Sequence, residues 1–146
     1  MKNIKEYILE AIRERQNPGI MIVIDCEAMN GMQDKIDDFI SDNEEYTNAI
    51  FALSMDKLKK IEDSSDLKLS GGYSTDLSQC VKVINQMKSS SCYIICDYMF
   101  AADKDVIEQI TKMKFTVFMD IVNADKSQID DLNKIYTSEN ITIELI

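Results

Sequence analysis

The stretch IMIVID at residues 20–25 decides the fold, because five consecutive apolar residues run directly into an acid. Polar residues do not alternate with apolar ones in this run, so neither face of a strand built from it would suit water. Such a run is typical of a strand buried on both faces, as in a parallel sheet covered by helices. Further runs that predict strands lie at 49–53, 92–96, 115–119 and, less regularly, 141–146.

Between these runs the apolar residues recur at helical spacing. The spacing predicts helices over 4–12, 36–40, 77–87, 106–113 and 129–136, and a short one over 58–61. A breaker cluster at 17–19 ends the first helix, and 62–73 is the one loop-like stretch.

Strands that alternate with helices predict an α/β fold: a three-layer open sheet of about five mostly parallel strands with helices on both faces. The sequence has neither an internal repeat nor a change of composition, so residues 1–146 are expected to form a single α/β domain. Burial in the central sheet is expected for Ile22, Ile24, Ile50, Ile94, Val117 and Phe118.

The chain is strongly acidic. It has 16 Lys and Arg residues and 26 Asp and Glu residues, which gives a net charge of −10, and it contains no His. An acidic surface repels phosphate backbones, so nucleic-acid binding is disfavoured. The lack of His excludes His-based triads and most zinc sites.

Cysteine usage and the N-terminus bear on the compartment. The four cysteines, at 26, 80, 92 and 96, form no C-x-x-C pair and are expected to be buried thiols. The N-terminus does not resemble a signal peptide, and no apolar run approaches the roughly 18 residues of a membrane span. These features predict a cytoplasmic protein without a membrane span.

Acids stand at the ends of the predicted strands: Asp25 and Glu27 after the first, Asp97 after the third and Asp120 after the fourth. Ligands of open α/β sheets bind beyond the carboxyl ends of the strands, and Mg²⁺ prefers a few carboxylates plus water. These four residues are therefore candidate metal ligands for Mg²⁺ or Mn²⁺. The alternative is that they only end strands and cap the following helices.

A phosphate-binding loop is absent from the sequence. Residues 25–33 carry two acids and a single Gly, which would repel an anion rather than surround it with amides. ATP binding is not expected, and neither catalytic nor cofactor-binding residues are assigned.

Large apolar residues also follow the strand ends. Met29, Met32, Met99 and Phe100 fall in segments where loops would face solvent, and Met suits adaptable protein interfaces. These four are candidate partner-binding residues, for another protein or for a second copy in a homo-oligomer. The alternative is that the loops fold under and fill the edge of the core.

The order of elements from Lys5 to Tyr136 resembles the RecA-like ATPase domain of pilus-retraction and type II/IV secretion ATPases. The stretch Ile94-Ile95-Cys96-Asp97 resembles the Walker B strand of that family, and 17–24 resembles the segment before its phosphate loop. Only Gly31 matches a phosphate-loop glycine, since the family's Lys falls at Met32 and its hydroxyl residue at Gln33. The resemblance implies a degenerate domain that keeps the fold and has lost ATP chemistry.

These observations predict a non-catalytic protein-interaction domain, similar to a degenerate secretion or pilus ATPase, that acts as a partner-binding or scaffolding subunit without a cofactor. The alternative is a Mg²⁺- or Mn²⁺-dependent nuclease or phosphohydrolase. PIN-like nucleases also begin with an apolar strand that ends in Asp, and Asp25, Asp97 and Asp120 would be its metal-binding trio.

Overall fold

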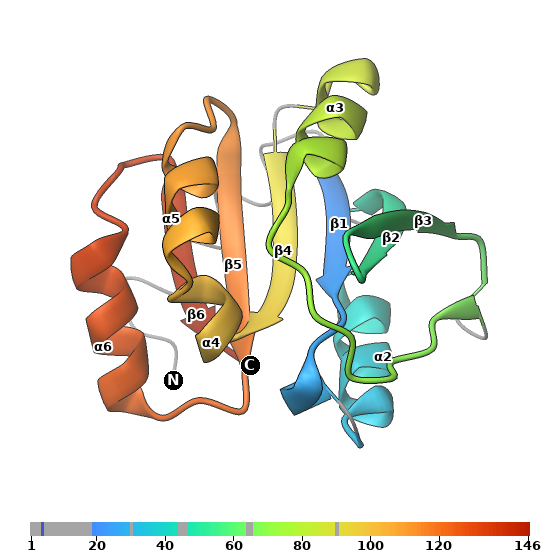
Figure 1. Ribbon diagram of the computed structural model, residues 1–146, viewed down its shortest axis with the longest axis horizontal. Helices are drawn as coiled ribbons and strands as arrows, with labels where there is room; N and C mark the ends of the chain where they lie inside the picture. The colour runs from blue at the N-terminus through green and yellow to red at the C-terminus, as the bar shows by residue number, and fades with distance from the viewer. Residues whose placement is uncertain (1–3, 5–18, 30, 44–46, 64–65, 90) are drawn as a thin grey trace.

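The computed structural model describes residues 4, 19–29, 31–43, 47–63, 66–89 and 91–146 (Figure 1). The helix expected over 4–12 lies outside the described residues, apart from Ile4.

A six-stranded sheet with the order β3-β2-β1-β4-β5-β6 forms the centre of the fold. Neighbouring strands are parallel except β3, which is antiparallel to β2. The α/β class and the mostly parallel sheet are confirmed, with one strand more than expected. The strands are β1 (Gly19–Ile24), β2 (Thr47–Ser54), β3 (Lys57–Ile61), β4 (Ser91–Asp97), β5 (Thr116–Val122) and β6 (Ile141–Leu145).

The additional strand is β3, where the sequence predicted a short helix over 58–61; that prediction is wrong. Met55 and Asp56 have φ angles of 51° and 61°, so both lie in the left-handed region. A two-residue turn of this kind matches the twist of paired strands and reverses the chain into a hairpin. Leu58 then pairs with Leu53 of β2 instead of starting a helical turn.

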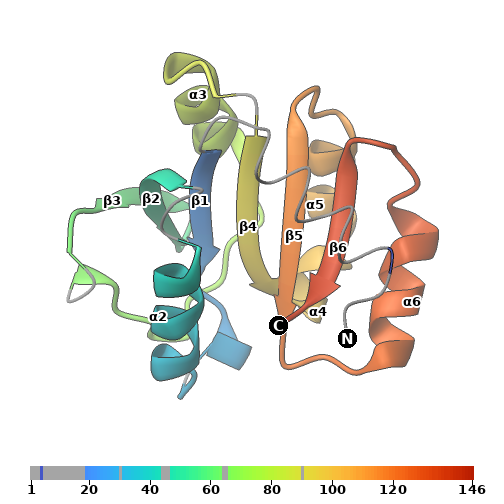
Figure 2. The same cartoon turned by 180° about the vertical axis from the view of Figure 1, so that it is seen from behind.

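Helices cover both faces of the sheet, as predicted (Figures 1 and 2). One face carries α2, and the other carries α3 to α6. The helical elements are η1 (Glu27–Met29), α2 (Gln33–Asp42), α3 (Ser78–Gln86), α4 (Tyr98–Ala101), α5 (Lys104–Thr111) and α6 (Lys126–Ile135). None of these described helices combines the length and apolar character that crossing a membrane would require.

Side chains point alternately to the two faces of the sheet, and each face packs into its own apolar core. On β5, Val117 and Met119 face the core beneath α3, α5 and α6, whereas Phe118 faces the core on the side of α2. There the Phe118 ring stacks on Tyr93 with 5.0 Å between ring centroids. Five of the six residues expected in the buried sheet are at most 1% exposed, and Ile50 is half-buried against the core on the side of α2.

The strand order reverses between β1 and β4, and this positions the site. The chain leaves β1 toward η1 and α2 on one face, and it leaves β4 toward α4 and α5 on the other. The two connections diverge, so a crevice opens between them at the carboxyl edge of the sheet. Open α/β sheets bind ligands at this kind of reversal.

Candidate functional site

The crevice contains two adjoining hollows that share Glu27, Asp97 and Met99. The more enclosed hollow has a volume of about 140 Å³ and is also lined by Cys26, Tyr73, Ser74 and Phe100. The shallower one has a volume of about 310 Å³ and extends past Ala28 and Tyr98 to Asn123 and Gln128. Of the shared residues, Glu27 follows β1, Asp97 is the last residue of β4 and Met99 follows β4, so the reversal of strand order creates the site.

Asp25 lies directly after β1, and its carboxylate is used by hydrogen bonds within the fold. Its carboxylate is 1% exposed. Oδ1 accepts hydrogen bonds from the amides of Ser70 at 3.1 Å and Gly71 at 2.9 Å. Oδ2 accepts from the hydroxyls of Ser54 at 2.8 Å and Ser70 at 3.1 Å. Donors surround both oxygens, so Asp25 fastens a loop to the sheet and has little capacity left for a metal ion.

These donors also determine the charge state of Asp25. Burial raises the pKa of the carboxyl, but hydrogen bonds from Ser54, Gly71, Gly72 and Ser70 outweigh it and lower the pKa below 3.8. Gly72 belongs to this arrangement for steric reasons. A Cβ there would lie 2.5 Å from the Ser54 hydroxyl and 3.1 Å from Oδ2 of Asp25. The loop can approach the carboxylate this closely because residue 72 has no side chain.

We call residues 69–77, which cross the carboxyl edge between β3 and α3, the strap. Its second anchor is Asp56 in the hairpin turn. Oδ1 of Asp56 accepts from the amides of Thr75 at 2.9 Å and Asp76 at 3.2 Å. The Asp56 amide donates in return to the Ser74 hydroxyl at 3.0 Å. The strap is therefore tied to the ends of both β1 and β2.

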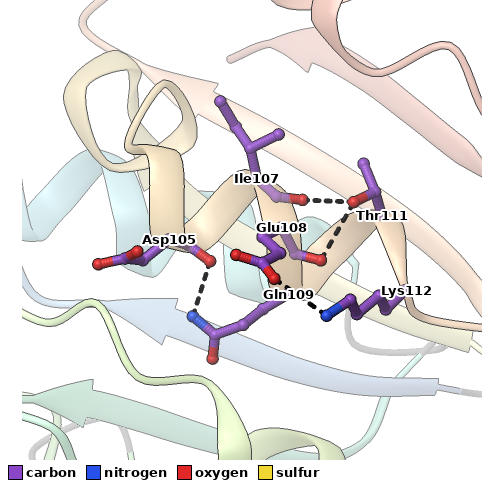
Figure 3. A network of polar contacts seen from close by, with 6 residues as sticks. All are labelled: Asp105, Ile107, Glu108, Gln109, Thr111 and Lys112. Carbon is purple, nitrogen blue, oxygen red and sulfur yellow. Dashed lines mark hydrogen bonds and ion pairs between the residues drawn. The ribbon is translucent and has the colours of Figure 1, made fainter.

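A third anchor comes from α5, whose polar face is shown in Figure 3. The side-chain amide of Gln109 donates to the Thr75 carbonyl at 2.6 Å and to the Asp105 carbonyl at 2.9 Å. Its oxygen accepts from the Leu77 amide at 2.7 Å. One Gln thus bridges the strap and α5, while the nearby Glu108–Lys112 ion pair, at 3.0 Å, is exposed on the same helix.

Asp97 lies at the bottom of the crevice, at the end of β4. It is 7% exposed, and its Oδ1 accepts from the Phe100 amide at 2.8 Å, which caps α4. The Cys26 thiol lies beside it. Burial, followed by the charge of Asp97, raises the pKa of Cys26 to about 12, so this thiol stays neutral. All four cysteines are free and buried, as the sequence predicted.

The mouth of the crevice is apolar. Tyr73 of the strap is 68% exposed and Met99 of α4 is 79% exposed, and both line the enclosed hollow. The Tyr73 hydroxyl donates to Asp103 at 3.2 Å, and this hydrogen bond raises the pKa of Tyr73. Met55 is 73% exposed, and its Cγ lies 3.5 Å from the position of a Cβ on Gly72. Met55, Tyr73 and Met99 are thus three exposed large apolar residues at the carboxyl edge of the sheet, and we call these three residues the edge patch.

The four acids expected together at the strand ends do not all lie in the crevice. Glu27 and Asp97 line the same hollows, and Asp25 is held by the strap. Asp120 is not at a strand end, because β5 continues to Val122 and Asp120 pairs with Ile95 and Glu144 inside the sheet. Within the described part of the chain, no group of three or more His, Cys, Asp or Glu side chains is placed to hold a metal. The metal site stays a prediction.

The four expected partner-binding residues differ in their exposure. Met99 is exposed, but Met29 and Phe100 are 0% and 4% exposed and belong to the cores, so for these two the alternative holds, in which the segments fold under and fill the core. Met32 is half-buried against the core beside α2. The reason is the short helices η1 and α4, which turn one side inward. The sequence did not mark Met55 and Tyr73 as site residues, although Met55 closely follows the strand predicted over 49–53.

Comparison with known proteins adds no assignment. No family model matches the chain, and no curated protein is significantly similar to it. The resemblance to RecA-like secretion and pilus ATPases is therefore still a prediction.

Proposed function

We propose that the chain is a non-catalytic protein-interaction domain that docks a partner protein on the edge patch, as a partner-binding or scaffolding subunit. The observation that carries the proposal is the exposure of Met55, Tyr73 and Met99 at one edge of the sheet. Large apolar side chains gathered at a surface favour protein contacts, and Met adapts to partners of different shape.

The edge patch is held on a fixed framework. Met55 sits in a two-residue turn, Tyr73 lies on the strap between the Asp25 and Asp56 anchors, and Met99 follows the Asp97 cap. Side chains presented from ordered backbone lose less entropy on binding than those on a mobile loop. This arrangement favours a docking surface over accidental exposure.

The acidic charge around the edge patch restricts the kind of partner that can dock there. Each residue of the edge patch has an acid beside it: Asp56 follows Met55, Asp103 accepts from the Tyr73 hydroxyl, and Glu27 lines the same hollow as Met99. With a net charge of −10, the chain attracts basic surfaces and repels acidic ones, including a second copy of itself. The expected partner is therefore a different protein whose docking segment combines apolar and basic residues.

Selection of a random displayed-peptide library against the whole chain tests this proposal, because such a selection needs no identified partner. We expect enriched peptides to contain apolar and basic residues. Their affinity should fall for Tyr73→Ser and Met99→Ser. It should persist for Met87→Ser, because Met87 is 44% exposed at the end of α3, away from the patch. Failure to enrich any peptide, or equal affinity for all three variants, would contradict the proposal.

A further inference from the structure

We propose that the crevice between β1 and β4 binds a small organic cation, an alkyl ammonium ion, with its charge at Asp97 and its hydrocarbon part between Tyr73 and Met99. The inference goes beyond the proposed function, because it requires no partner protein.

Asp97 carries a negative charge that no described residue in the lining of the two hollows balances. The carboxylate is more than nine-tenths buried, and its Oδ1 is occupied by the Phe100 amide. Its neighbour Cys26 stays a neutral thiol, and among the residues that the structure describes none that lines either hollow is Lys or Arg. A buried carboxylate is stabilised by an opposite charge nearby. An ammonium group in the hollow would supply that charge.

The lining of the enclosed hollow suits an alkyl ammonium ion. Phe100 and Met99 give it apolar walls, and the largely exposed Tyr73 adds an aromatic residue to the lining. Apolar walls with a few polar groups are typical of small-ligand sites, and an aromatic face attracts a cation. Such a wall would contact the alkyl chain of an amine, but it has no oxygen ligands for a hydrated metal ion.

The two hollows together have the size of a small-ligand site, and their charge selects against anions. Hollows of about 140 and 310 Å³ that share three residues give room for an extended ligand, with the polar side chains of Asn123 and Gln128 at the far end. Pockets for small ligands span about 300–1,000 Å³. Glu27 and Asp97 would repel a phosphate or carboxylate, so anionic metabolites are excluded by charge.

Calorimetric and NMR titration of the whole chain with cadaverine tests the inference, with glutarate as an anion of equal chain length. At an ionic strength of about 0.15 M, which screens surface attraction, we expect saturable cadaverine binding and amide shifts at residues 27, 74 and 99. Glutarate should produce neither. Asp97→Asn should weaken binding by roughly tenfold or more, since it removes the charge, while an Asn still caps α4.

Two further variants keep the result interpretable. Glu27→Gln changes an exposed residue, so it should fold normally and still weaken binding. Glu108→Gln is the matched control: it removes an acid from a neighbouring hollow of about 400 Å³ lined by Thr75, Asp105 and Gln109, and binding should be unchanged. No saturable binding, equal binding of glutarate, or equal loss with Glu108→Gln would each overturn the inference. Tyr73 and Met99 belong to both proposals, but amine titration and peptide selection are separate measurements, so either proposal can fail while the other holds.

Discussion

The carboxylate of Asp25 accepts a hydrogen bond from the backbone amide of Gly71, 46 residues later in the chain, at 2.9 Å. This contact joins the end of β1 to the strap and thereby places Tyr73 at the mouth of the crevice. An acid that the sequence offered as a metal ligand anchors the loop that shapes the site.

Asp25→Asn should lower the free energy of unfolding by about 2–3 kcal/mol, because it replaces a buried charged acceptor with a neutral amide that meets donors on both sides. Urea unfolding monitored by circular dichroism measures the change. Asp130→Asn, an exposed change on α6, is the matched control and should stay within about 0.5 kcal/mol of wild type. Equal stability of the two variants would show that the strap is not held by Asp25.

Acid should destabilise the chain partly through the same carboxyl. The pKa of Asp25 is lowered below 3.8 in the folded state, so as the pH falls the unfolded chain takes up this proton first. The contribution of Asp25 is fully present above about pH 5 and is lost as the pH falls through the folded pKa. Urea unfolding over a pH series should show a shallower acid-side loss in Asp25→Asn than in wild type. Parallel curves would contradict this assignment.

Met55→Asn should raise stability and weaken docking together. Met55 has a φ of 51°, where a residue other than Gly is strained, and Asn accepts this conformation more readily. We expect a gain of about 0.5–1 kcal/mol in urea unfolding and a loss of affinity for the selected peptides. Met99→Asn lies on an ordinary helical backbone, so it should weaken docking without any gain in stability.

Mg²⁺ and Mn²⁺ should raise the melting temperature no more than NaCl of equal ionic strength. Asp25 already accepts four hydrogen bonds, and Asp120 lies within β5 rather than in the crevice. Differential scanning fluorimetry gives the comparison. A rise specific to Mn²⁺ that Glu27→Gln and Asp97→Asn abolish would favour the metal-dependent hydrolase instead.

The sequence by itself determined the parallel sheet and most of its helices. Runs such as 20–24 and 92–96 lack a water-compatible face, so any fold that contains them must cover both sides of a strand. The helices on the two faces follow from the 3.6-residue spacing between these runs. Both signals are local, and the sequence carries them whatever the rest of the chain does.

Only the tertiary structure decided the hairpin and the site. Residues 57–61 became a strand because a left-handed turn set them beside β2, and Asp120 was placed inside β5 by pairing with its neighbours. Asp25 was assigned its role by donors 45 and 46 residues away. Whether a side chain near a strand end is buried, like Phe100, or exposed, like Met99, depends on which way a four-residue helix is turned. Contacts between distant segments determine these outcomes, and the spacing of apolar residues along the sequence does not reveal such contacts.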